Sequence, residues 1–129
     1  MSGSVLLDTN IIIGILAKDE AILSRLTETE AVFLPSIALG ELYFGAFKSA
    51  HPNDNAERID RLADSTAILY CDGTTALHYG RIKTTLRARG RPIPENDIWI
   101  AAIAQQHGLT VVSRDLHFRE IENLSVEEW

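Results

Sequence analysis

Short apolar runs alternate along the chain with longer stretches in which apolar residues recur at helical spacing. The runs of strand length are Val5 to Leu7, Val32 to Leu34, Ala67 to Tyr70 and Thr110 to Val112, with a weaker candidate near Leu124 to Val126. Between them the periodicity predicts helices over 9–17, 21–27, 36–49, 55–64, 74–89 and 95–107. Strands that alternate with helices predict a mainly parallel sheet with helices on both faces.

Glycine and proline residues support this division of the chain. Gly108 follows the last predicted helix, where glycine accepts the left-handed conformation at little cost. Gly90, Pro92 and Pro94 separate the two preceding helices. No internal repeat or flexible linker interrupts the 129 residues, so we expect residues 1–129 to form one domain.

Composition restricts the environment of the protein. Cys71 is the only cysteine, so an internal disulfide and a cysteine-rich metal site are excluded, as is usual in a reducing compartment. No apolar run approaches the roughly 20 residues that span a bilayer, and the N-terminus lacks the pattern of a signal peptide. We therefore expect a cytoplasmic protein that does not associate with membranes.

Four acidic residues lie in or beside segments that are otherwise apolar. Asp8 is the only charge in VLLDTNIII, and Glu41 is the only charge in IALGELYFGAF. Asp97 directly precedes the uncharged run IWIAAIAQQ, and Asp115 comes shortly after the apolar run 109–112. Burial of an unpaired carboxylate is costly, so four such placements favour a shared site in which a cation offsets the charges.

The predicted topology brings these carboxylates to one edge of the sheet. Asp8 and Asp115 each follow a strand, and functional groups collect where parallel strands end. Asp97 lies in the first turn of a helix that should begin at the same edge, and Glu41 would reach in from its own helix. Oxygen ligands suit Mg²⁺ or Mn²⁺, which can activate water for hydrolysis of a phosphodiester.

Each acid also has a purely structural interpretation. Asp8 could cap the helix that begins at Thr9, and Asp97 could stabilise its helix through the dipole by about 0.3–1 kcal/mol. Asp115 could begin a turn. Glu41 has no such role, because it lies inside its helix. The joint pattern therefore favours the metal site.

Other catalytic classes have little support in the sequence. The four histidines lack the paired spacing of a zinc site; they are His51, His78, His107 and His117. There is no Gly-x-Ser-x-Gly elbow and no glycine-rich phosphate loop. The aromatic residues Tyr43, Phe44, Phe47 and Trp99 lie in apolar runs and are expected to pack in the core.

The basic residues are clustered, although the net charge of the chain is −6. Five of the twelve basic residues lie within 81–91, a segment without acidic residues. From this segment Arg87, Arg89 and Arg91 are candidates for contacts with RNA phosphates, since guanidinium groups bind phosphate in bidentate fashion. The alternative is a solvated helix face, and the sequence leaves both interpretations open.

Four sequence blocks resemble those of a known family, in its order and spacing. They are VLLDTNIII, LGELYFGA, RPIPENDIWIAA and VVSRDLHF, and together they span nearly the whole chain. They are similar to blocks of PIN-domain ribonucleases, especially VapC-type toxins of toxin–antitoxin pairs. The resemblance implies a three-layer α/β/α sandwich and a metal-dependent endoribonuclease that cleaves RNA.

The resemblance also implies roles for individual residues. It places the catalytic, metal-binding acids at Asp8, Glu41, Asp97 and Asp115, with supporting polar groups at Asn10, Asn96 and Ser113. Where the family often has threonine, this chain has Ser113, which keeps the hydroxyl. The family further implies a homodimer and a small antitoxin partner.

Two other functions stay open at this point. One is a phosphatase in which Asp8 is the nucleophile, although such enzymes usually have a second acid where Asn10 stands. The other is a non-catalytic PIN-like binding module. The presence of all four acids argues against loss of catalysis.

Overall fold

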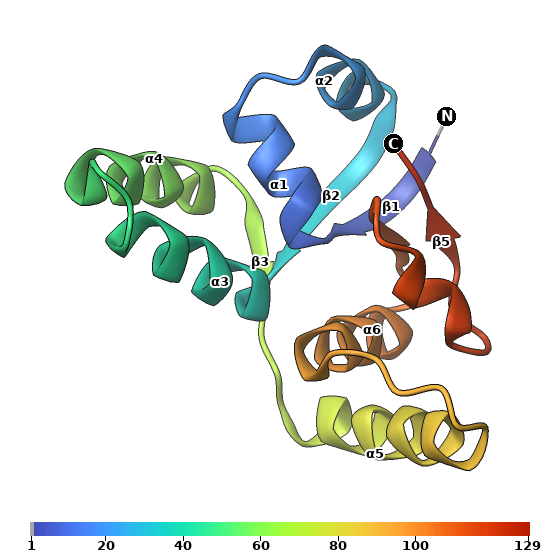
Figure 1. Ribbon diagram of the computed structural model, residues 1–129. Helices are drawn as coiled ribbons and strands as arrows, with labels where there is room; N and C mark the ends of the chain where they lie inside the picture. Colours follow the sequence, from blue (N-terminus) through green and yellow to red (C-terminus); the bar gives the residue numbers. More distant parts are fainter. Residues whose placement is uncertain (1) are drawn as a thin grey trace.

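The computed structural model describes residues 2–129. Its helices are α1 (Thr9–Leu16), α2 (Glu20–Thr27), α3 (Ser36–Phe47), α4 (Pro52–Asp64), α5 (Gly73–Ala88) and α6 (Glu95–His107), with a 3₁₀ helix η1 at Leu116–Glu120 (Figure 1). Its strands are β1 (Ser2–Leu7), β2 (Thr29–Pro35), β3 (Ala67–Leu69), β4 (Thr110–Val112) and β5 (Val126–Glu127). The predicted elements are confirmed, and η1 is the element that the periodicity did not predict.

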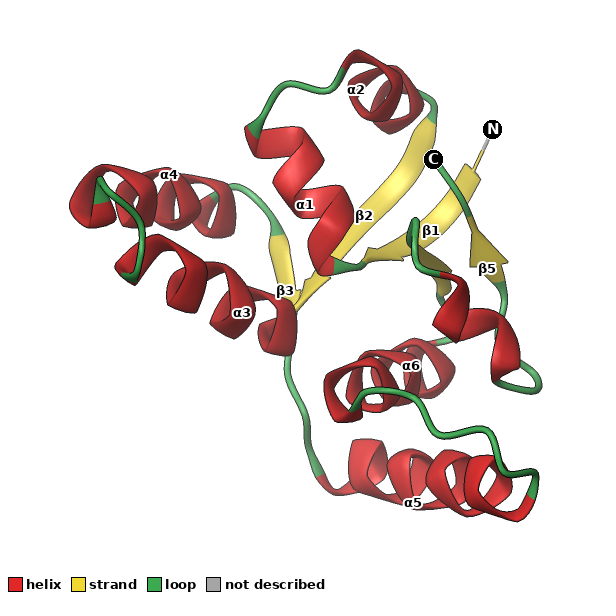
Figure 2. Ribbon diagram, viewed as in Figure 1, coloured by secondary structure: helices red, strands yellow, loops and turns green. Residues whose placement is uncertain are grey.

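The strands of this part of the chain form one parallel sheet in the order β3-β2-β1-β4-β5 (Figure 2). Alternate residues of the central strand β1 enter different cores. Leu6 packs with α5, α6 and η1, whereas Val5 and Leu7 pack with α1 to α4. The three side chains are fully buried. This alternation confirms the three-layer α/β/α sandwich.

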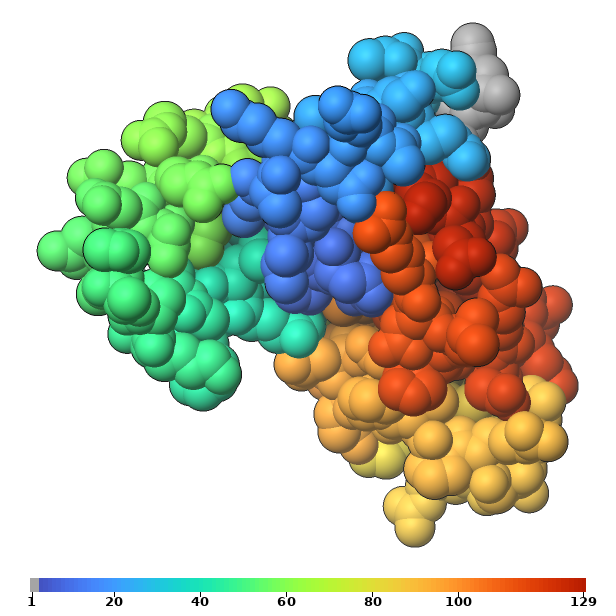
Figure 3. Space-filling view, turned by 45° about the horizontal axis from the view of Figure 1, so that its top comes forward, coloured from blue at the N-terminus to red at the C-terminus, as the bar shows by residue number. Residues whose placement is uncertain are grey.

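The β1–α1 segment is central in the molecule. The space-filling view shows α1, which begins directly after β1, in blue between the green α3–α4 segment and the red C-terminal segment (Figure 3). The end of β1 is therefore within reach of side chains from both halves of the chain. No helix within residues 2–129 is long and apolar enough to cross a membrane.

Two aromatic residues are more exposed than the sequence suggested. Phe44 and Phe47 are 66% and 65% exposed, although both were expected in the core. They lie on the outer side of α3, whose buried residues are Ala38, Leu42 and Ala46. Since this helix is apolar on all sides, its sequence does not reveal which face is covered. Cys71 is also exposed and makes no disulfide.

Candidate metal centre

The site begins where β1 and β4 end side by side. Leu7 pairs with Val112, and the backbone N–H of Asp8 donates to the Val112 carbonyl at 2.9 Å. Asp8 and Ser113 are thus the first residues beyond two neighbouring strands. Both are buried, at 5% and 2% exposure. This placement confirms that Asp8 lies at the carboxyl edge of the sheet, as the topology predicted.

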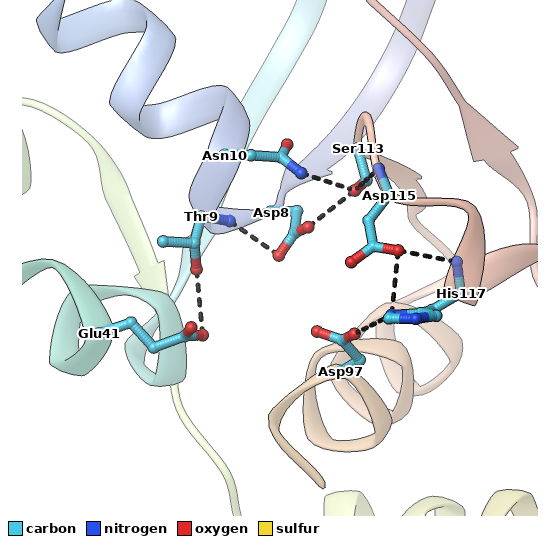
Figure 4. Close-up of polar contacts among 8 residues, drawn as sticks. All are labelled: Asp8, Thr9, Asn10, Glu41, Asp97, Ser113, Asp115 and His117. Atoms are coloured by element: carbon cyan, nitrogen blue, oxygen red, sulfur yellow. Dashed lines mark hydrogen bonds and ion pairs between the residues drawn. The ribbon is translucent and has the colours of Figure 1, made fainter. Parts of the chain in front are cut away.

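The Ser113 hydroxyl connects Asp8 with the loop after β4. It donates to Asp8 Oδ2 at 2.7 Å and accepts from the Asp115 backbone N–H at 2.9 Å. The Asn10 side chain donates to the same hydroxyl at 3.4 Å and accepts from the Arg114 backbone N–H at 3.2 Å. These bonds fix the relative positions of Asp8 and Asp115 (Figure 4).

Asp97, Asp115 and His117 form the tightest group of potential metal ligands. His117 Nδ1 lies 3.0 Å from Asp115 Oδ1 and 3.3 Å from Asp97 Oδ2. One ligand atom from each residue lies within 4.8 Å of the others. Asp97 comes from the first turn of α6, whereas the other two belong to the segment after β4. The fold therefore joins distant parts of the chain here.

Glu41 approaches from α3, on the other side of Asp8 (Figure 4). Its Oε1 accepts a hydrogen bond of 3.1 Å from the Thr9 hydroxyl, which adjoins Asp8 in sequence. Glu41 lies outside the tight group of Asp97, Asp115 and His117. Asn96 is exposed and lines, together with Glu41 and Phe44, a hollow of about 420 Å³ beside the acids.

Burial and mutual repulsion make two of the carboxylates hard to ionise. Burial, followed by the charge of Asp8, raises the pKa of Asp97 to about 6. Burial also raises the pKa of Asp8, against the lowering effect of hydrogen bonds from Ser113 and Thr9. The charges of Asp8, Asp97 and Asp115 therefore interact in a partly water-excluded space.

Two of the site acids also cap helices, as their structural interpretation predicted. Asp8 is the N-cap of α1 and accepts from the Thr9 backbone N–H at 2.8 Å. Asp115 is the N-cap of η1 and accepts from the His117 backbone N–H at 2.9 Å. A carboxylate oxygen has more than one lone pair, so a cap contact leaves acceptor capacity for a cation.

The donors present suit a divalent cation. Among the ion pairs found in residues 2–129, Asp97 and Asp115 pair with His117 and with no lysine or arginine. The guanidinium of Arg114 points elsewhere, to Asp19 and to the backbone carbonyl of Trp129. Lysine and arginine side chains thus do not neutralise these carboxylates. Such a group of carboxylates can bind a hard cation such as Mg²⁺ or Mn²⁺.

The basic segment is partly neutralised by acids of its own. Arg89 Nη1 lies 3.5 Å from Glu122 Oε1, and Arg91 Nη1 lies 3.6 Å from Glu120 Oε2. Arg87 is exposed and makes none of the ion pairs found in residues 2–129. Of the three arginines, Arg87 is thus the most available to an anionic ligand.

Comparison with known proteins decides the family. A model of the PIN domain matches residues 5–124. The chain belongs to the PIN domain family. Its fold resembles that of VapBC2 from Rickettsia felis, solved bound to a promoter DNA fragment, with a TM-score of 0.90 and 27% identity over 98% of both chains. The expected family and its fold are therefore confirmed.

Two relatives with known names extend this family assignment. The chain is 39% identical over 127 residues to Ribonuclease VapC2 of Haemophilus influenzae, with 96% of each chain covered. It is 35% identical, with the same coverage, to the tRNA(fMet)-specific endonuclease VapC of Salmonella typhimurium. Membership of the PIN family favours the nuclease hypothesis over the phosphatase with an aspartate nucleophile.

Two residues make contacts at this site that sequence reasoning did not predict. Thr9 was considered only as the start of a helix, yet its hydroxyl joins Glu41 to the β1 end. His117 was not expected to be a metal ligand, because no second histidine stands at metal-ligand spacing. Its position two residues after Asp115 indicated only a contact with the substrate.

Proposed function

We propose that this PIN-domain protein is a metal-dependent endoribonuclease with Asp8, Glu41, Asp97 and Asp115 as its catalytic acids. The observation that supports the proposal best is the convergence of these acids, from segments far apart in sequence, beside the ends of β1 and β4. Residues 1–129 would act as one nuclease domain. The names of the VapC relatives add support for RNA as the substrate.

The site residues divide into ligands and groups that position them. Asp8, Asp97 and Asp115 would hold a divalent cation, Mg²⁺ or Mn²⁺, and Glu41 would face the site from α3. The bound ion would supply an activated water and stabilise charge on the phosphate oxygens. Ser113 and Asn10 orient Asp8 and the loop that carries Asp115. Asn96 would contact RNA from the rim of the hollow near Glu41.

The partners follow by analogy with the relatives. VapBC assemblies from Rickettsia felis and from nontypeable Haemophilus influenzae share this fold, at TM-scores of 0.90 and 0.89. We propose that the chain is the toxin of such a pair, that a small antitoxin inhibits it in the cytoplasm, and that it forms a homodimer.

Cleavage of RNA with and without divalent cation tests the proposed activity. Purified protein, freed of antitoxin, is incubated with total tRNA and with a labelled unstructured RNA in Mg²⁺, in Mn²⁺ or in EDTA. We expect discrete internal fragments in either cation and none in EDTA, because the carboxylates need the ion to approach a phosphate. Fragments of equal yield in EDTA would contradict metal dependence. Binding of RNA without cleavage in any cation would favour the binding module.

The arginines of the basic segment are expected to strengthen RNA binding. Replacing Arg87, Arg89 and Arg91 together with alanine should weaken binding and lower the slope of log K against log salt, by about 0.7 for each phosphate of a single strand that the variant no longer neutralises. Arg87→Ala alone should account for most of the change, since the other two already pair with Glu122 and Glu120. Binding measured at several salt concentrations with catalytically inactive protein checks this, and an unchanged slope would favour the solvated face.

A further inference from the structure

We propose that His117 is a nitrogen ligand of the metal centre and makes the site prefer Mn²⁺ to Mg²⁺. This inference rests on the proposed function, since it assigns a ligand and a metal preference to the same site. The sequence pattern assigned only carboxylates. The structure adds an imidazole that contacts two of them, Asp97 and Asp115.

The distances around the imidazole match those of ligands that share an ion. Two donor atoms each about 2.1 Å from one ion, at adjacent coordination positions, lie about 3 Å apart. His117 Nδ1 lies 3.0 Å from Asp115 Oδ1 and 3.3 Å from Asp97 Oδ2. The ring nitrogen therefore lies where a ligand that shares an ion with either carboxylate would lie.

The backbone around His117 supports this orientation. Its N–H donates to Asp115 Oδ1 at 2.9 Å, so the carboxylate that faces the ring also fixes the start of η1. The neighbouring Phe118 is fully buried and anchors the short helix in the core. The His117 side chain itself is 49% exposed, which leaves the ring open to an ion and its waters.

The kind of donor determines the metal preference. Mg²⁺ takes oxygen ligands in a strict octahedral geometry and gives up water reluctantly. Mn²⁺ also binds carboxylates, but it belongs to the first-row transition ions, which accept imidazole nitrogen more readily than Mg²⁺ does. Within that series Mn²⁺ binds such sites most weakly, so the inferred preference concerns Mn²⁺ against Mg²⁺ alone. A site with carboxylates alone would bind Mg²⁺ and Mn²⁺ through the same oxygens. Adding one imidazole nitrogen therefore favours Mn²⁺ over Mg²⁺.

Pulsed electron paramagnetic resonance of bound Mn²⁺ tests the ligand directly. Wild type should show modulation from a nitrogen nucleus coupled to Mn²⁺, and His117→Gln should lose it while still binding the ion. His107→Gln is the matched control, because His107 is an exposed histidine at the other end of α6 and should leave the modulation intact. Titration should show an Mn²⁺ Kd that rises about tenfold in His117→Gln, with the Mg²⁺ Kd changed by less than about twofold.

The possible results separate this inference from the proposed function. Mn²⁺ bound by wild type without nitrogen modulation, or with modulation that survives in His117→Gln, overturns the role of His117 and leaves the carboxylate site standing. Equal losses of Mn²⁺ and Mg²⁺ affinity in that variant would overturn the metal preference. Absence of Mn²⁺ binding by wild type would contradict both the inference and the metal dependence proposed for the nuclease.

Discussion

Asp8→Asn is expected to lower the rate of RNA cleavage by about a thousandfold while the fold is kept, a size typical for loss of one preorganised charged group in a water-excluded site. Asparagine has nearly the shape of aspartate, and its amide oxygen can still accept from the Thr9 backbone N–H that Asp8 caps. The variant lacks the negative charge at the point where β1 meets β4. Single-turnover cleavage under saturating Mg²⁺ measures the effect.

Asp72→Asn is the matched control for Asp8→Asn. Asp72 is also a helix N-cap and accepts from the Thr75 backbone N–H at 3.1 Å, but it caps α5 and contacts Gln106 rather than the site acids. We expect nearly wild-type cleavage by this variant. If Asp8→Asn retained more than about a tenth of wild-type activity with an intact circular dichroism spectrum, its assignment as a catalytic acid would be wrong.

The positions of the acids could be predicted because they depend on topology rather than on detailed packing. Asp8 and Asp115 follow strands, and neighbouring parallel strands end at one edge whatever the side chains around them do. The position of Asp97 could be predicted from the start of α6 alone. For the same reason the layers of the sandwich followed from the alternation of apolar runs, since each β1 residue faces one of two helix layers.

The contacts that tie the acids together could not be predicted in this way. The bond from Thr9 to Glu41 depends on how α3 is rotated over the end of β1. Such a rotation is set by the packing of Ala38, Leu42 and Ala46, and α3 is apolar all round, so its pattern does not indicate the covered face. The exposure of Phe44 has the same cause. His117 reaches Asp97 only because η1 turns the chain after β4, and a 3₁₀ helix of five residues has no clear periodic signature.

Metal is expected to reverse the order of stability between wild type and Asp97→Asn. The pKa of Asp97 is raised from 3.8 to about 6 in the folded protein. Because this pKa is higher in the folded state, the folded protein binds the proton of Asp97 more tightly than the unfolded chain does. Protonation therefore stabilises the fold, and this stabilisation is complete below about pH 4 and is lost as pH rises through about 6. Without metal at pH 7.5, the neutral Asp97→Asn should therefore be more stable than wild type, by about 2 kcal/mol.

Bound cation removes this disadvantage of the wild type because it neutralises the repulsion among Asp8, Asp97 and Asp115. At a free Mn²⁺ concentration of 100 times Kd, binding to the folded state adds about 2.7 kcal/mol. Asp97→Asn lacks one of the ligands and should gain much less. Thermal unfolding of both proteins at pH 7.5, in EDTA and in Mn²⁺, should thus show the variant with the higher Tm in EDTA and wild type with the higher Tm in Mn²⁺. Equal shifts with Mn²⁺ would place the ion away from Asp97. A wild type that is already more stable than the variant in EDTA would mean that burial and the charge of Asp8 do not destabilise the ionised Asp97.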